Sequence, residues 1–271
     1  MSADLRRYRL RHRTRPLDVW VAGEGDPLLL LHGWGLSGRA YEDTLLAIAD
    51  RGFRVAAPSL AVAEGWSMVG IAELAAEAMA GVDVAPAPVV GHSFGGAVGA
   101  TLAVNHPDFV TALLAVSSPL VSLGGLRMSR VVLPGRHFRI VTHAPAAAAL
   151  MRAATTRNGF GSLARAARWV MANGHDATLS KLAETDIPRA IVWAEADSLL
   201  PSEIGVKAAE LLGCELHVFG ADESWNGARP PDHDWPFRHS EHFAGAILSV
   251  LQGLLGDPDD EVPARGDGGA A

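Results

Sequence analysis

Cysteine is almost absent from this sequence: Cys214 is the single one among 271 residues. One thiol cannot form an intrachain disulfide, and it gives no sign of metal binding by several thiolates. Long apolar runs are lacking too, because no stretch reaches the roughly 18 unbroken apolar residues of a membrane-spanning helix. The first residues, Met1–Arg7, contain no apolar segment like that of a signal peptide. We therefore expect a cytoplasmic protein without a membrane span.

Acidic residues are missing from one long stretch, although the whole chain carries a formal net charge of −7. Residues 119–175 contain no Asp or Glu, whereas arginine recurs there: Arg127, Arg130, Arg136, Arg139, Arg152, Arg157, Arg165 and Arg168. These arginines could form a solvated helix face, or they could attract an anionic substrate or an acyl carrier. The overall acidity, and the lack of aromatic residues interleaved with the arginines, disfavour nucleic-acid binding.

Strand and helix patterns alternate along most of the chain. The expected strands are residues 5–13, 17–22, 28–31, 53–57, 110–116, 189–194 and 215–219, together with the strand that leads to Ser93. The expected helices are residues 39–50, 69–80, 94–105, 202–212 and 241–255. This order predicts an α/β fold with a mostly parallel central sheet flanked by helices. The site should then lie at the carboxyl ends of the strands.

The alternation stops in the middle of the chain. Residues 119–186 are therefore predicted to be a helical cap, or lid, inserted into a core made of residues 1–118 and 187–255. The acidic, Pro- and Gly-rich residues 256–271 are predicted to be a disordered tail.

A Gly-x-Ser-x-Gly turn, Gly91-His92-Ser93-Phe94-Gly95, joins an apolar strand to a helix of small residues. In that context the serine sits at the tip of a sharp turn and exposes its hydroxyl above the sheet. The N–H of Phe94, at the start of the helix, can then stabilise an oxyanion. Alone, the motif could equally be a glycine-rich turn that happens to contain serine.

A serine nucleophile needs a base and a group that orients the base. Asp197 follows a predicted strand at the same edge as Ser93, whereas Asp186 precedes that strand and Glu195 lies closer to the sheet. Of the eleven histidines, His233 lies in the loop after the last strand, from which a base can overhang the serine. A metal site made from His233, Asp234, His239 and His242 is a weaker alternative.

The chain resembles an α/β-hydrolase-fold serine hydrolase of the esterase type. The matching segments are Leu30–Gly35, Gly91–Gly96, Trp193–Asp197 and His233–Pro236, in the family's order of nucleophile, acid and histidine. The resemblance implies that Ser93 is the nucleophile, His233 the general base and Asp197 its orienting acid. It also implies an oxyanion hole made by the N–H groups of Trp34 and Phe94, with no cofactor and no metal. The family's loop after the fourth strand is altered here, at residues 58–67.

The expected reaction is hydrolysis of a carboxylic ester through an acyl-enzyme. The substrate should be small or medium-sized and fairly apolar, and an acyl carrier is a candidate partner. Thioester hydrolysis or acyl transfer, lactone opening, C–C bond hydrolysis and peracid formation stay open on the same fold. A non-catalytic ligand-binding protein is the alternative from another class. Apolar side chains of the cap could line the pocket or simply pack on the core: Met128, Phe138, Met151 and Trp169.

Overall fold

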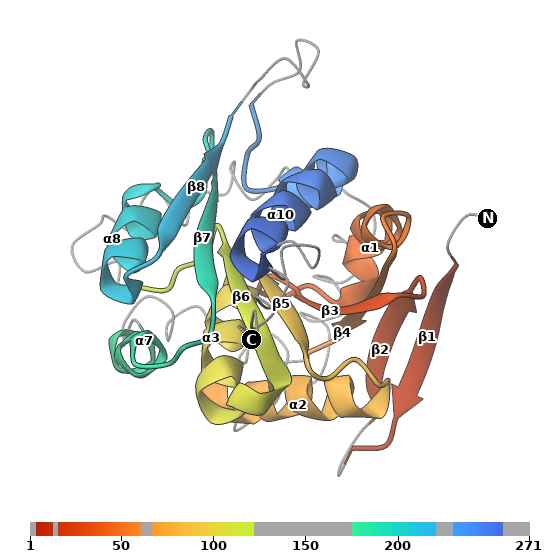
Figure 1. The fold of residues 1–271 in the computed structure, drawn as a ribbon. Coiled ribbons are helices and arrows are strands. Elements are labelled where there is room, and N and C mark those ends of the chain that lie inside the picture. The colour runs from red at the N-terminus through yellow and green to blue at the C-terminus, as the bar shows by residue number, and fades with distance from the viewer. Residues whose placement is uncertain (1–3, 13–15, 61–66, 122–174, 221–229, 257–271) are drawn as a thin grey trace, which may run out of the picture.

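We analysed a computed structural model of the chain, in which residues 4–12, 16–60, 67–121, 175–220 and 230–256 are described. Their strands form one eight-stranded sheet in the order β1-β2-β4-β3-β5-β6-β7-β8 (Figure 1). The strands are β1 (Leu5–Leu10), β2 (Leu17–Ala22), β3 (Asp26–Leu31), β4 (Phe53–Pro58), β5 (Ala87–His92), β6 (Val110–Val116), β7 (Arg189–Ala194) and β8 (Glu215–Phe219). The pairs β1–β2 and β2–β4 are antiparallel, and all other pairs are parallel.

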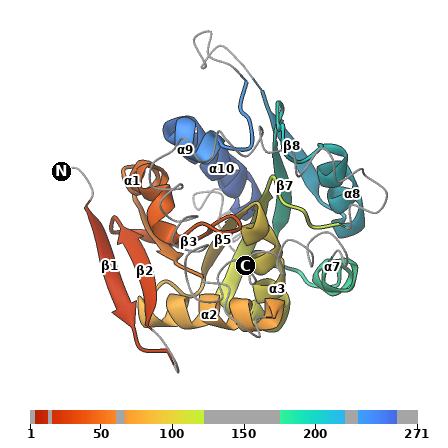
Figure 2. The same cartoon turned by 180° about the vertical axis from the view of Figure 1, so that it is seen from behind.

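Helices cover both faces of the sheet (Figures 1 and 2). One face carries α2 (Met68–Gly81), α3 (Phe94–Asn105), α7 (Asp176–Ala183) and α8 (Glu203–Leu212). The other face carries α1 (Glu42–Ala49), α9 (Trp235–Arg238) and α10 (Ser240–Leu255). The short 3₁₀ helices are η1 (Gly38–Tyr41) and η2 (Pro107–Phe109). No helix in these described ranges is both long and apolar enough to cross a bilayer.

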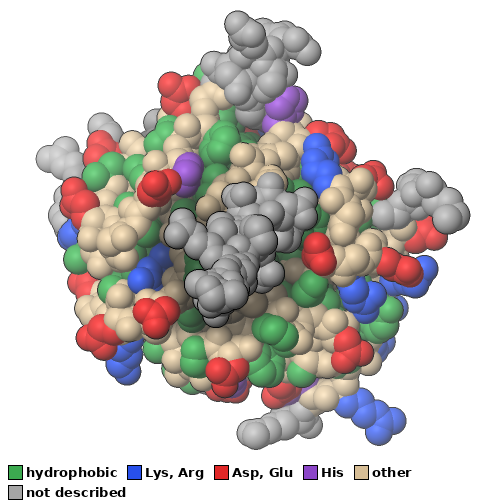
Figure 3. Space-filling model, viewed as in Figure 1, with side chains coloured by type: hydrophobic (Ala, Val, Ile, Leu, Met, Phe, Trp, Pro, Cys, Tyr) green, Lys and Arg blue, Asp and Glu red, His purple; other side chains and the backbone are tan. Residues whose placement is uncertain are grey.

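Four consecutive leucines at the end of β3 show why the sheet needs both helical layers. Leu28 and Leu30 pack into the layer of α1 and α10, whereas Leu29 and Leu31 pack into the layer of α2 and α3. All four are completely buried. Because side chains alternate between the two faces of a strand, a continuous apolar run is stable only where both faces are covered. Figure 3 shows acidic and basic groups mixed over the described part of one face.

The structure confirms the expected α/β fold and its mostly parallel sheet. Some element limits differ from expectation. β1 ends at Leu10 rather than at residue 13, and the single helix expected over 39–50 is split into η1 and α1 at Tyr41. At the start of η1, Gly38 packs so closely on β4 that an added Cβ would overlap the carbonyl of Ala57. This close approach brings the η1 segment, with Tyr41 at its end, against the sheet.

The cap prediction falls mostly outside the described residues. Residues 122–174 are among those not described, and with them the pocket candidates Met128, Phe138, Met151 and Trp169 and the arginines of that stretch. α7, inside the predicted cap boundaries, packs against α3 and α8 through the buried Leu179 and Leu182. The predicted tail also lies outside the described residues, apart from Gly256. The proposed domain boundaries therefore stay predictions.

Glycine at position 95 lets α3 approach the end of β3. A Cβ on Gly95 would overlap the backbone carbonyl of Leu31, whereas a Cβ on Gly245 of α10 would meet no atom within 4 Å. We therefore expect Gly95→Ala to destabilise the fold by about 3 kcal/mol or more, because backbone must move. Gly245→Ala should stabilise it by about 0.5–1 kcal/mol through helix propensity. Denaturant unfolding of both variants checks this, and equal stability of the two would contradict the close approach of α3.

Candidate active site

Ser93 stands between β5 and α3 in a backbone conformation that L-residues rarely adopt. Its φ is 54° and its ψ is −122°. The Ser93 N–H donates a hydrogen bond to the carbonyl of Val116 at the end of β6, 2.8 Å away. A Cβ on Gly91 would overlap the carbonyl of Gly95, so the turn closes only with glycine there. The strain is held by the surrounding sheet and directs the hydroxyl above the edge of the sheet.

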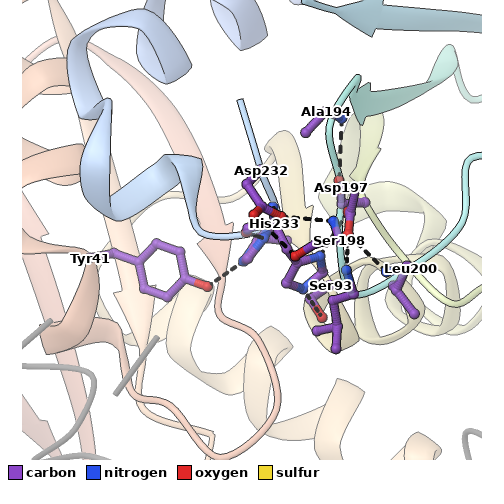
Figure 4. A network of polar contacts seen from close by, with 11 residues as sticks. Tyr41, Ser93, Ala194, Asp197, Ser198, Leu200, Asp232 and His233 are labelled. Atoms are coloured by element: carbon purple, nitrogen blue, oxygen red, sulfur yellow. Dashed lines mark hydrogen bonds and ion pairs between the residues drawn. The ribbon is translucent and has the colours of Figure 1, made fainter. Parts of the chain in front are cut away.

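His233 lies between Ser93 and Asp197 (Figure 4). Its Nε2 is 3.1 Å from the Ser93 hydroxyl oxygen, and its Nδ1 is 2.9 Å from Oδ2 of Asp197. A carboxylate only accepts hydrogen bonds, so Nδ1 carries the proton and Nε2 is left to accept one from the serine hydroxyl. The structure thus brings together three residues that are far apart in the sequence. They come from the loops after β5, β7 and β8.

The Asp197 carboxylate is held from two sides. Its Oδ1 accepts hydrogen bonds from the backbone N–H groups of Leu199 (2.9 Å) and Leu200 (2.8 Å), which leaves Oδ2 for His233. Only 1% of the Asp197 side chain is exposed. Glu195, the lesser alternative, is exposed and its carboxylate lies against Gly220 instead. Asp186 is exposed before β7, at the opposite edge of the sheet.

The carboxylates around His233 decide its proton affinity. Burial by itself lowers the pKa of His233, but the negative charges of Asp197, Asp232 and Asp234, together with the hydrogen bond that His233 donates to Asp197, outweigh burial. The pKa of His233 is therefore raised above its ordinary value. A raised pKa makes this imidazole a stronger base for the Ser93 proton.

Asp232 joins the two loops that supply His233 and Asp197, and we did not single it out from the sequence. Its Oδ1 accepts from the backbone N–H groups of Ser198 (2.8 Å) and His233 (2.7 Å), and its Oδ2 accepts from the Ser198 hydroxyl (3.0 Å). The only available sequence signal was an acidic residue directly before the chosen histidine. Ser198 follows Asp197, so this carboxylate holds the acid and the base at a fixed separation.

The loop after β3 runs beside Ser93. A Cβ added to Gly33 would lie 3.4 Å from the Cβ of Ser93, and Trp34 is the next residue. The turn is fixed by buried His32, whose Nδ1–H donates to the Gly33 carbonyl (2.8 Å) while its Nε2 accepts from the Leu60 N–H (2.9 Å). Burial lowers the pKa of His32 to about 4, consistent with a neutral ring in this role. Phe94, the other predicted oxyanion residue, is the first residue of α3.

Four other histidines that the structure describes have partners of their own. His106 pairs with Glu73, and His217 on β8 pairs with Glu215. His239 and His242 lie with ring centroids 6.4 Å apart. Within the described ranges, no group of three or more His, Cys, Asp or Glu residues could hold a metal ion. Of the residues named for the alternative metal site, His233 contacts Asp197 and Ser93 instead.

Comparison with known proteins identifies the fold. A family model described as alpha/beta hydrolase fold matches residues 26–139. A pimeloyl-[acyl-carrier protein] methyl ester esterase of Vibrio cholerae is 37% identical over 100 residues, 36% of this chain and 39% of that enzyme. A putative non-heme haloperoxidase of Mycobacterium phage D29 is 24% identical over 242 residues, 78% of this chain and 86% of that protein.

A solved structure extends the likeness to nearly the whole chain. The thioesterase domain from the curacin biosynthetic pathway superposes with a TM-score of 0.68 at 17% identity, covering 90% of this chain and 99% of that domain. The match with the Vibrio esterase, by contrast, spans about two fifths of that enzyme. The sheet order, the turn at Ser93 and these matches agree: this chain is an α/β-hydrolase-fold protein.

Proposed function

We propose that the protein is a serine hydrolase that cleaves a carboxylic ester of a small or medium-sized, fairly apolar substrate. One observation carries the proposal: the hydrogen-bonded series from Ser93 Oγ through both ring nitrogens of His233 to Asp197. A ligand-binding protein has no need of all three groups in this order. The esterase name of the Vibrio relative supports the same reaction class.

The proposed reaction proceeds in two halves. Ser93 Oγ attacks the ester carbonyl carbon while its proton passes to His233 Nε2, and the imidazolium is stabilised by Asp197. His233 then gives this proton to the departing alcohol, which leaves an acyl-serine. In the second half, His233 takes a proton from water as the water attacks the acyl group, and it returns that proton to Ser93 when the acid departs.

The proposed oxyanion hole consists of the N–H groups of Trp34 and Phe94. Donors of this kind act on the negative charge that exists only in the tetrahedral intermediate, and each is worth roughly 3–4 kcal/mol of barrier. Trp34 is supported because the residue before it, Gly33, lies beside Ser93. Phe94 is supported because it directly follows Ser93 at the start of α3. Ser93 itself is partly exposed.

An ester carried on an acyl carrier protein is a second candidate substrate. The name of the Vibrio relative favours it, and so do the arginines between residues 119 and 175, because acyl carriers are anionic. Thioesters, lactones and C–C bonds next to a ketone could use the same three groups. The choice among them depends on the shape of the acyl pocket.

A fluorophosphonate probe tests whether Ser93 is an activated nucleophile. We expect stoichiometric labelling of the wild-type protein at Ser93, no labelling of Ser93→Ala, and hydrolysis of short-chain chromogenic esters by the wild type alone. Mass spectrometry of the labelled peptide identifies the serine. Labelling at another serine would refute the site, and absence of both labelling and hydrolysis would favour the ligand-binding alternative.

The orienting acid and the base are tested by substitution with matched controls. Asp197→Asn should lower kcat roughly 10⁴-fold with little change in KM, because the amide favours the wrong tautomer of the imidazole, as in other serine triads. His233→Ala should be at least as severe. Glu195→Gln removes an exposed acid directly after β7, and His217→Gln removes a histidine on β8. Neither side chain has a described contact with Ser93, and both variants should keep wild-type kcat. Activity lost equally in Glu195→Gln would point to the wrong acid.

The pH dependence follows from the raised pKa of His233. The base must be neutral to accept the serine proton, so kcat/KM should fall as pH drops through a midpoint above about 6.5. Asp232→Asn removes one negative charge yet keeps an oxygen for the Ser198 and His233 N–H groups, so the midpoint should move to lower pH. The exposed Asp186→Asn is the control and should leave the midpoint in place. An unchanged midpoint in Asp232→Asn would mean that Asp232 does not tune His233.

A further inference from the structure

We propose that Tyr41 and His92 are positioning residues, whose side chains link the oxyanion loop after β3 to the main chain of His233. This inference rests on the proposed function, because it concerns the alignment of the same three groups. Neither side chain touches the reacting atoms of Ser93 in the contacts described above. Tyr41 acts through the backbone N–H of Gly33, and His92 acts through the backbone carbonyl of His233.

Three buried hydrogen bonds make up the link. The Gly33 N–H donates to the Tyr41 hydroxyl (3.0 Å), this hydroxyl lies 2.7 Å from Nδ1 of His92, and Nε2 of His92 lies 3.1 Å from the carbonyl oxygen of His233. The Tyr41 and His92 residues are each 1% exposed. Figure 4 shows the Tyr41 hydroxyl pointing from the end of η1 toward the group around Ser93 and His233.

The direction of every hydrogen bond in the link is determined. A backbone carbonyl only accepts, so Nε2 of His92 must carry the proton that is donated to His233 O. In a neutral ring Nδ1 then accepts, and the Tyr41 hydroxyl must donate to it. That leaves the hydroxyl oxygen to accept from the Gly33 N–H. Burial and the nearby His233 lower the pKa of His92 well below its ordinary value, so the ring stays neutral.

The link connects three loops that are far apart in the sequence, those after β3, β5 and β8. Gly33 precedes Trp34, a proposed oxyanion donor, and His92 precedes Ser93. The carbonyl at the far end belongs to His233, the proposed base. A shift of about 1 Å among such groups costs roughly 100-fold in rate. Fixing Gly33 and the His233 carbonyl relative to the Ser93 turn therefore sets the distances on which the proposed reaction depends.

Packing alone does not account for the tyrosine hydroxyl. The Tyr41 ring contacts Phe237 with centroids 4.7 Å apart and the His92 ring at 5.9 Å, and phenylalanine could make both contacts. Without the hydroxyl, the buried Gly33 N–H and Nδ1 of His92 would both lose a partner, each at a cost in stability. Tyr41→Phe therefore removes the hydrogen bonds and keeps the ring.

The experiment compares Tyr41→Phe with Thr101→Val in the full chain. Thr101 is a buried hydroxyl that donates to the Ala97 carbonyl within α3, so its loss destabilises the fold away from the link. We expect Tyr41→Phe to lower kcat by roughly 10–100-fold with KM within about twofold, and Thr101→Val to keep kcat. Affinity for a trifluoromethyl ketone analogue of the tetrahedral intermediate should fall with kcat in Tyr41→Phe only. Wild-type kcat and analogue affinity in folded Tyr41→Phe would overturn the proposal.

A second measurement covers the case in which Tyr41→Phe does not fold. Long-range ¹H–¹⁵N NMR of the wild-type protein should find His92 neutral with its proton on Nε2 from pH 5.5 to 8.5, the signal being assigned through its loss in His92→Gln. A proton on Nδ1, or titration in this range, would overturn the link. Failure of the fluorophosphonate to label Ser93 would refute the proposed function instead, whatever the NMR result.

Discussion

The hydrogen bond between Asp197 and His233 is the contact on which the rest of the site depends. Both side chains are almost fully buried, at 1% and 5% exposure, and an unpaired carboxylate there would be costly. Asp197 avoids that cost because the N–H groups of Leu199 and Leu200 and the imidazole together occupy its oxygens. The same hydrogen bond holds the His233 imidazole in one tautomer. The contact that satisfies the buried Asp197 charge therefore also orients the ring toward Ser93.

The direction of the parallel strands brings Asp197 and His233 close enough to form this hydrogen bond. Parallel strands end at one edge, so the segments after β3, β5, β7 and β8 meet there although they are separated in the sequence. Glycine sets how closely they meet. Gly95 allows α3 to lie against the end of β3, and Gly91 allows the turn at Ser93 to close. The distances between the site residues therefore depend on glycines at these close contacts.

Much of this could be predicted from the sequence. The strand pattern and the order of Ser93, Asp197 and His233 were enough to place these residues at one sheet edge, because alternation and strand direction are local properties. Asp232 and Tyr41 were not predicted, because their partners lie on other elements and their roles depend on which backbone atoms come within hydrogen-bond reach. The 3₁₀ segment η1 was not predicted for a similar reason: its first residue, Gly38, lies against β4, which is distant in the sequence. The predicted pocket residues depend on the part of the chain that is not described.

Two histidines with opposite requirements lie side by side at the centre of the site. The rings of His92 and His233 have centroids 5.0 Å apart. In the proposed reaction His233 must accept a proton in every cycle, and a second cation at this distance would oppose that step. Burial keeps His92 neutral, and its donation to the His233 carbonyl makes use of the neutral form. The carboxylates of Asp197, Asp232 and Asp234 then act on His233 without a competing positive charge from His92, and they raise its pKa although burial opposes this.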